Sequence, residues 1–223
     1  MKPDQIDLAG ARYSDLFRRA LKFTLPWECV FAAGHDGDYD YVLAEDVDGD
    51  PGGTTKFGID QASHPSIQVE YLNLPRAMEI YWKREWDWMR GEVVGGNDSC
   101  GSEQLAVALF DSTVNPGRIA IHWLQDILGV KADGKIGPQT VEAIYDSGTL
   151  SLVTSQLLTR REVYYRSRGA WAGAFRAGWL NRTAALRKYL ISGSWSDPVR
   201  GDDGLVPPGP GEAPAVSPLA TGH

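Results

Sequence analysis

The apolar positions of this chain recur mainly at helical spacing. In the first such stretch, Phe17, Ala20 and Leu21 fall on one helical face, and Ser14 stands where its side chain would cap the first turn. Pro26 lacks the backbone N–H that a helix interior needs. The pattern therefore predicts a helix that begins at Ser14 and ends or kinks at Pro26.

Apolar spacing of three to four residues returns along much of the remaining chain. Proline and glycine mark where these later helices begin and end. The pattern predicts helices within residues 67–88, with Pro75 in a first turn; over 103–114, ended by Asn115-Pro116-Gly117; over 118–128, ended by Gly129; from Pro138 onward; and over 150–191, with interruptions near Gly169 and Gly178.

Residues 34–53 break the helical pattern. Glycine and aspartate gather at both ends of this segment, and Tyr39, Tyr41 and Leu43 alternate between them. Alternation bounded by turn residues favours a short β-hairpin or a long ordered loop. The fold class that follows is mainly α (α+β), with one small β-hairpin or loop insertion after the first helix.

Three further segments carry no clear core pattern. We expect residues 1–13 to form a loose leader and residues 91–101 to form a flexible joint. Residues 193–223 consist largely of Pro, Gly, Ala and Ser, which bury too little apolar surface to support a fold. We therefore expect a disordered tail there.

The charge of the chain narrows the classes of protein it can belong to. Lys and Arg total 22 against 29 Asp and Glu, and the resulting net charge of -7 argues against a general nucleic-acid-binding protein. No apolar run is long enough to span a membrane. A basic cluster late in the chain favours a solvated helix face, and a local basic patch stays open. Its members are Arg160, Arg161, Arg166, Arg168, Arg176, Arg182, Arg187 and Lys188.

The two cysteines, Cys29 and Cys100, give neither a disulfide scaffold nor a metal site by themselves. The first residues also lack the apolar stretch of a secretory signal. We therefore expect both thiols to be reduced, with Cys29 serving as a small core residue.

Glu28 is the first candidate for chemistry. It is the only acid in an apolar stretch that includes Trp27, Val30 and Phe31. Burial against such side chains raises the pKa of a carboxyl group, so that it can hold a proton near neutral pH and act as a general acid in glycoside hydrolysis. The plainer interpretation is a helix-end carboxylate that is exposed or paired with an arginine.

A glycosidase also needs a second group that stabilises charge or positions a water molecule. Asp46, Asp48 and Asp50 are candidates, and Thr54 or Thr55 could hold the water. A separation of about 6.5–9.5 Å between two carboxyl groups gives inversion, and about 5–5.5 Å gives retention. The sequence leaves this choice open, as it leaves open a solvated turn.

A metal site is the weaker interpretation of the same acidic segment. The string D-V-D-G-D from Asp46 resembles part of a calcium loop, but its twelfth position is Phe57 where a bidentate acid is required. His35 stands near further aspartates, yet the other histidines are scattered. We therefore expect no metal and no cofactor.

Two longer strings carry a family resemblance. The chain has W-E at Trp27-Glu28 and D-P-G-G-T-T-K-F-G-I at Asp50–Ile59, followed by F-D-S-T-V-N-P-G, L-Q-D-I-L-G-V and D-G-K-I-G-P-Q-T, the last at Asp133–Thr140. In this order they resemble the glycoside hydrolase family 108 N-acetylmuramidases, over about residues 14–191. The resemblance implies a lysozyme-like helical fold, with a catalytic module over 14–100 and a predicted peptidoglycan-binding module over 101–192.

The resemblance also implies roles for individual residues. Glu28 would be the catalytic acid, with Asp50 and Thr55 in support and Asp46 near the groove. The chain differs from the family where E-C-V-F replaces E-G-G-Y, ahead of a longer connection to the D-P-G-G string. The predicted substrate-binding residues are Asp46, Asp48, Tyr39, Asp111 and Asn115. For Asp111 and Asn115, which lie four residues apart on one helix face, a capping and turn network is the alternative.

The expected function is therefore hydrolysis of the β-1,4 bond between N-acetylmuramic acid and N-acetylglucosamine. The partner would be the glycan strands of bacterial peptidoglycan, and we expect a monomer. Without a signal peptide, the protein would reach the wall through a holin, by non-classical export or in a virion. The alternatives are a non-catalytic wall-binding module of a phage particle or secretion apparatus, and a stem-peptide amidase or peptidase.

Overall fold

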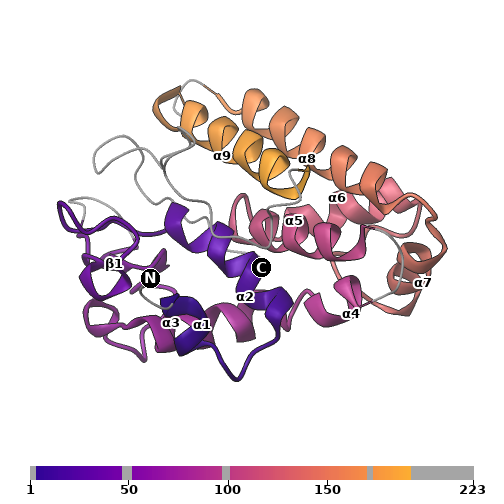
Figure 1. Cartoon of the computed structure of the whole chain (residues 1–223). Helices are drawn as coiled ribbons and strands as arrows, with labels where there is room; N and C mark the ends of the chain where they lie inside the picture. The colour runs from indigo at the N-terminus through magenta and orange to yellow at the C-terminus, as the bar shows by residue number, and fades with distance from the viewer. Residues whose placement is uncertain (1–3, 47–51, 97–100, 170–172, 192–223) are drawn as a thin grey trace.

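The structure is a computed structural model, and it describes residues 4–46, 52–96, 101–169 and 173–191. It is mainly helical with one two-stranded sheet, so the predicted fold class is confirmed (Figure 1). The α-helices are α1 Gln5–Ala9, α2 Asp15–Thr24, α3 Leu74–Tyr81, α4 Gly91–Gly95, α5 Ser102–Val114, α6 Ile119–Leu128, α7 Pro138–Asp146, α8 Leu150–Ser167 and α9 Gly173–Ile191. The short turns are η1 Leu25–Trp27, η2 Tyr39–Tyr41, η3 Val69–Tyr71 and the π-helical turn η4 Trp82–Trp86.

The first predicted helix has the predicted ends. The Ser14 hydroxyl accepts a hydrogen bond from the Phe17 N–H at the start of α2, and Pro26 lies in the turn η1 that follows the helix. The expectation of a loose leader is wrong for α1. Asp4 caps that helix and Ile6 is buried, so α1 packs on the core.

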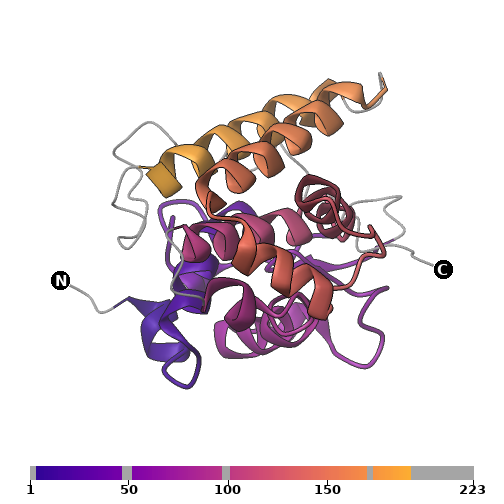
Figure 2. The ribbon, with the colours of Figure 1, turned by 90° about the vertical axis from the view of Figure 1, so that its right-hand side faces the viewer.

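Helix α5 lies at the centre of the molecule. Every residue from Leu105 to Val114 is buried, because α2, α4 and α8 pack around it. Helices α8 and α9 form a pair that covers this central helix, as the two views in Figures 1 and 2 show. The helix that the sequence assigns to the second module is thus also the core of the first.

The β-hairpin lies later in the chain than the alternation of tyrosines predicts. Strand β1 (Thr55–Lys56) pairs antiparallel with β2 (Ile59–Asp60), whereas Tyr39–Tyr41 form the 3-10 turn η2. The physical reason is the Asp38 side chain, which accepts from the Asp40 N–H and closes a turn where a strand was expected. Only isolated bridges, Phe31 to Val42 and Glu45 to Thr55, extend the sheet-like pairing within the described residues.

Two other expectations are corrected. Part of the expected joint at 91–101 is the helix α4, which packs against α2 and α5; a Cβ atom at Gly95 would lie 2.3 Å from a Leu16 methyl carbon, so glycine there serves close packing. Helix α9 runs through Gly178 without interruption. The predicted tail lies outside the described residues. Among the helices of the described part, none is both long and apolar enough to cross a membrane.

Candidate functional site

Glu28 lies where the chain leaves the turn η1. Its backbone N–H donates to the Leu25 carbonyl oxygen at 3.0 Å, which closes that turn, and its residue is 7% exposed. The local cause is Pro26, which is accommodated near the start of a 3-10 turn but not inside α2. The predicted burial of this acid is therefore present.

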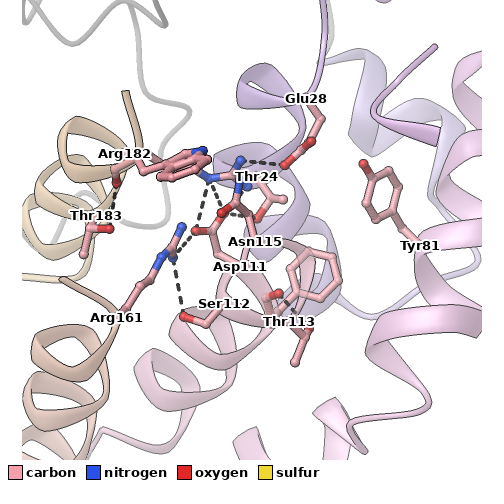
Figure 3. Close-up of polar contacts among 12 residues, drawn as sticks. Thr24, Glu28, Tyr81, Asp111, Ser112, Thr113, Asn115, Arg161, Arg182 and Thr183 are labelled. Atoms are coloured by element: carbon pink, nitrogen blue, oxygen red, sulfur yellow. Dashed lines mark hydrogen bonds and ion pairs between the residues drawn. The ribbon is translucent and has the colours of Figure 1, made fainter. Parts of the chain in front are cut away.

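The Glu28 carboxylate meets an arginine from the far end of the chain. Arg182, on α9, donates from Nη1 to Glu28 Oε1 at 2.5 Å (Figure 3). Arg182 is itself only 4% exposed. A charge-assisted contact between two buried groups is strong because little water competes for either partner.

Asp111 completes a buried cluster around this arginine. Its Oδ1 accepts from Arg182 Nη2 at 2.6 Å, and its Oδ2 accepts from Arg161 Nη1 at 2.6 Å (Figure 3). The Thr24 hydroxyl adds a third donor at 3.0 Å. We call Glu28, Arg182, Asp111 and Arg161 the charge cluster. Its members come from η1, α9, α5 and α8, so four parts of the fold meet at one point.

The two acids of the charge cluster respond to it differently. Burial raises the pKa of Glu28, and the opposing charge and hydrogen bond of Arg182 do not cancel that effect. Burial also acts to raise the pKa of Asp111, but Arg182 and Arg161 together hold it below its usual value. Glu28 is therefore the acid of this cluster that can keep a proton.

The turn of the hairpin packs against the other carboxyl oxygen of Glu28, Oε2. Phe57 and Gly58 connect β1 to β2, and both have positive φ, 56° and 69°, as a two-residue type I′ hairpin turn requires. A Cβ atom at position 58 would lie 2.7 Å from Glu28 Oε2, so only glycine fits. The Tyr81 hydroxyl donates to the Phe57 carbonyl oxygen at 2.8 Å and fixes the turn.

The other predicted residues are more dispersed. Asp46 is exposed, and Asp48 and Asp50 lie outside the described residues. The Thr55 hydroxyl donates to the Gly53 carbonyl oxygen at 3.4 Å, and its backbone pairs with Glu45. Tyr39 packs against the Phe31 ring, and burial raises the pKa of its hydroxyl well above the usual value.

The prediction that Asp111 contacts the glycan does not agree with the structure. Asp111 is fully buried, and both of its oxygens are bound to arginine, so no surface of it is open to a substrate. Asn115 follows α5 directly, and its Oδ1 accepts from the Tyr165 hydroxyl at 2.5 Å. The solvated helix face expected for the basic cluster is likewise wrong for Arg161 and Arg182, which are buried.

Four residues of this region were missed by sequence reasoning: Arg182, Arg161, Tyr81 and Gly58. The signal for Gly58 was present, since it is the glycine of the K-F-G-I string. For the arginines, the only signal was their place on apolar helices. Cys29 is a free thiol beside the site, and burial raises its pKa well above the usual value, so it is not a reactive thiolate.

A small cavity adjoins the hairpin turn. It has a volume of about 20 Å³ and is lined by Gly58, Ile59, His64, Ile80, Tyr81, Arg84, Glu85 and Val114. Two of these residues, Gly58 and Tyr81, also lie beside Glu28. Within the described part of the chain, no three His, Cys, Asp or Glu side chains are grouped as a metal site would need.

Comparisons with known proteins match two successive segments of the chain to two different families. Residues 34–117 match the family described as glycosyl hydrolase 108, and residues 119–184 match the family described as the predicted peptidoglycan domain. Among solved structures, the chain resembles the structure of Brucella abortus SagA with a TM-score of 0.57 and 24% identity, over 70% of this chain and 88% of that chain. No curated protein matches it. The two matches confirm the family resemblance predicted from the sequence and the order of its two segments, and the first match extends to residue 117, so that α5 falls within it.

Proposed function

We propose, from its match over residues 34–117 to the family described as glycosyl hydrolase 108, that this chain is a peptidoglycan hydrolase in which Glu28 is the general acid. The bond cleaved is the β-1,4 link between N-acetylmuramic acid and N-acetylglucosamine. The observation that carries the proposal is a carboxyl group that is buried, has a raised pKa and faces a glycine-lined turn.

The contacts of Glu28 define where its proton resides. Oε1 accepts a short hydrogen bond from Arg182, and an oxygen in that position is a poor place for a proton. The proton is therefore carried by Oε2, the oxygen that lies beside Gly58. In the reaction, Oε2 protonates the leaving glycosidic oxygen as positive charge develops on the sugar.

The second group of the reaction belongs to the acidic segment before the hairpin. Thr55 lies on β1, two residues before the turn that contacts Glu28, and it is the candidate that positions water. Asp50 is the candidate for stabilising the developing charge. Retention and inversion both remain compatible with this assignment.

The direct test uses purified peptidoglycan and mass spectrometry of the released muropeptides. Wild-type protein should create new reducing ends while leaving stem peptides attached, because a muramidase cuts the glycan only. Glu28→Gln should remain folded and lose this activity, whereas Glu142→Gln, a change at an exposed glutamate, should retain it. Wild-type rates in Glu28→Gln would exclude the assignment, and release of stem peptides from intact glycan would indicate an amidase.

One observation favours a non-catalytic wall-binding module as the second candidate function. The Glu28 side chain is little exposed to solvent, and its carboxyl group forms an ion pair with Arg182 in this structure. A pull-down on insoluble peptidoglycan, combined with a reducing-sugar assay, separates the two functions. Binding without new reducing ends would favour the module, and binding with new reducing ends favours the hydrolase.

A further inference from the structure

The charge cluster contains more groups than acid catalysis alone requires. Asp111 and Arg161 are both 0% exposed, so neither can touch a glycan strand. Each nevertheless makes a short contact inside the cluster, and Asp111 links Arg161 to Arg182. Burying charged groups away from water is costly, and it is tolerated where they are paired and hydrogen-bonded. Their arrangement around Glu28 therefore calls for an explanation.

The balance of formal charge in the cluster depends on Glu28. When Glu28 is ionised, two guanidinium groups face two carboxylates. When Glu28 holds a proton, the same two guanidinium groups face the Asp111 carboxylate alone. Arg182 favours ionised Glu28, and an ionised Glu28 cannot act as a general acid. Burial is the larger effect that opposes this ionisation, and the charge of Asp111 adds to it.

We propose that Asp111 and Arg161 are positioning residues that act through Arg182, holding the Glu28 carboxyl in place and setting how readily it keeps its proton. This inference rests on the proposed function, because it concerns the acid of that reaction. It assigns to Asp111 a role that differs from substrate contact.

The geometry of Arg182 shows how Asp111 acts through it. Asp111 accepts from Arg182 Nε at 3.1 Å and from Nη2 at 2.6 Å, which leaves Nη1 directed at Glu28. A guanidinium group is planar, so two contacts on one edge fix the direction of the third nitrogen. Asp111 thereby aims Arg182 at Oε1 of Glu28.

Asp111 is itself held by a second set of contacts. Arg161 Nη1 binds its Oδ2, and Arg161 Nε donates to the Tyr165 hydroxyl at 3.0 Å. That hydroxyl donates in turn to Asn115. The orientation of Glu28 thus depends on side chains of α5 and α8, of which Asp111 and Arg161 are labelled in Figure 3.

The ionisable groups that face Glu28 have defined signs. Arg182 from α9 lowers its pKa, Asp111 from α5 raises it, and Arg161 from α8 lowers it. Tyr81 from α3 and the adjacent Cys29 both have pKa values raised well above their usual values, so they stay neutral. Removing the charge of Asp111 and removing that of Arg161 should therefore move the Glu28 pKa in opposite directions.

The test measures kcat/KM on purified peptidoglycan across pH 4 to 9. A general acid works while protonated, so activity falls as the pH rises through the Glu28 pKa. Asp111→Asn should move this falling limb to lower pH by about one unit, a shift expected for one charge at close range in a protein interior. Arg161→Gln should move it to higher pH, by about half a unit.

Matched controls are available on the surface of the same helices. Arg160 on α8 pairs with Asp126 on α6, and both side chains are about half exposed. Arg160→Gln and Asp126→Asn should leave the limb in place, because solvent screens that pair. Arg161→Lys keeps the charge and should restore the wild-type position of the limb.

The two variants are expected to shift the falling limb of the pH profile in opposite directions, so the directions of the two shifts decide the test. Shifts in the same direction for Asp111→Asn and Arg161→Gln, or no shift in folded variants, would overturn the inference. If one variant does not fold in a thermal melt, the direction of the other decides alone. Loss of activity in Glu28→Gln with unmoved limbs removes only this inference, whereas activity retained in Glu28→Gln removes the proposed function itself.

Discussion

Two buried glutamates in this structure differ in what surrounds them. Glu28 is 7% exposed and Glu85 is 3% exposed, and burial raises the pKa of both, that of Glu85 to about 7. Glu28 makes a short contact with Arg182. Among the described residues, neither carboxyl oxygen of Glu85 makes a hydrogen bond of normal geometry, although the Thr113 side chain lies close enough to lower its pKa. Both carboxyls influence Tyr81, which stands between the two environments.

The groups near Glu85 are engaged elsewhere. Arg84 contacts His64 Nε2 at 2.5 Å, and Arg118 stacks on the Trp88 ring. Both arginines lower the Glu85 pKa through space, yet neither forms an ion pair with it. Because burial raises the pKa of both glutamates, a raised pKa alone does not identify a general acid. Of these two glutamates, Glu28 is the one whose carboxyl group is oriented by an ion pair, as the proposed role requires.

Exchanging each glutamate for glutamine should give the largest difference. Glu28→Gln removes the proposed proton donor and should lower the rate of peptidoglycan hydrolysis by at least about 100-fold, a typical contribution of general acid catalysis. Glu85→Gln should keep the rate within a few-fold of wild type. Reducing-end release at pH 6 measures both. A large loss of hydrolysis rate in Glu85→Gln would contradict this difference between the two glutamates and would make Glu85 a participant in the reaction.

Removing Arg182, the arginine that pairs with Glu28, should have the next largest effect, which is a loss of folding stability. Arg182→Met leaves Glu28 and Asp111 buried without their shared partner, and we expect a loss of about 3–5 kcal/mol of unfolding free energy. Arg160→Met, at a half-exposed ion pair, should cost no more than about 1 kcal/mol. Urea unfolding followed by circular dichroism checks both values. Equal losses of unfolding free energy in the two variants would show that the charge cluster stabilises the fold no more than a half-exposed ion pair does.

The pH dependence of stability should report Glu85. Its pKa is about 7 in the folded protein against an ordinary value of 4.5, so it binds its proton more tightly when folded. The stability it contributes is complete below pH 4.5 and is lost as the pH rises to about 7, an effect of about 3 kcal/mol. Glu85→Gln should lack this loss. Parallel urea titrations at pH 4.5 and 7.5 test it, and identical pH dependence in the two proteins would contradict the assignment.

Two glycines of the hairpin region give the smallest and most specific effect. Gly53 and Gly58 have φ values of 66° and 69°, so alanine is strained at both, by about 1–2 kcal/mol. A Cβ atom at Gly53 approaches nothing closer than 3.8 Å, whereas at Gly58 it would meet Glu28 Oε2. Gly58→Ala should therefore lose more activity and more stability than Gly53→Ala, because its added methyl group also meets Glu28 and the Tyr81 hydroxyl. Equal activities, assayed on peptidoglycan, would mean that the turn does not confine Glu28.

The sequence predicts the helices well because their signals are local. The Ser14 cap and the stop at Asn115-Pro116-Gly117 each depend on a few adjacent residues, and α2 begins and α5 ends where these signals indicate. The β-hairpin was placed too early because alternation at Tyr39 and Tyr41 was interpreted without the Asp38 side chain that closes a turn there.

The candidate site was predictable only in part. Glu28 could be chosen because its burial follows from its neighbours in the chain. Its main partner could not, because Arg182 lies 154 positions away, and nothing in a linear pattern distinguishes a buried arginine from one on a solvated face. The sequence predicts Asp111 as a contact for the glycan or as part of a capping network, whereas its ion pairs are made with side chains of α8 and α9 that no local pattern connects to it.

The distance in sequence between Glu28 and Arg182 limits how this protein can be divided. Glu28 precedes the segment that matches glycosyl hydrolase 108, and Arg182 stands near the end of the segment that matches the predicted peptidoglycan domain. A fragment cut at the boundary between the two would separate an acid from its counter-ion and expose the apolar sides of α5. The halves are therefore not interchangeable parts, and a chimera that borrows one of them must also inherit a matching arginine.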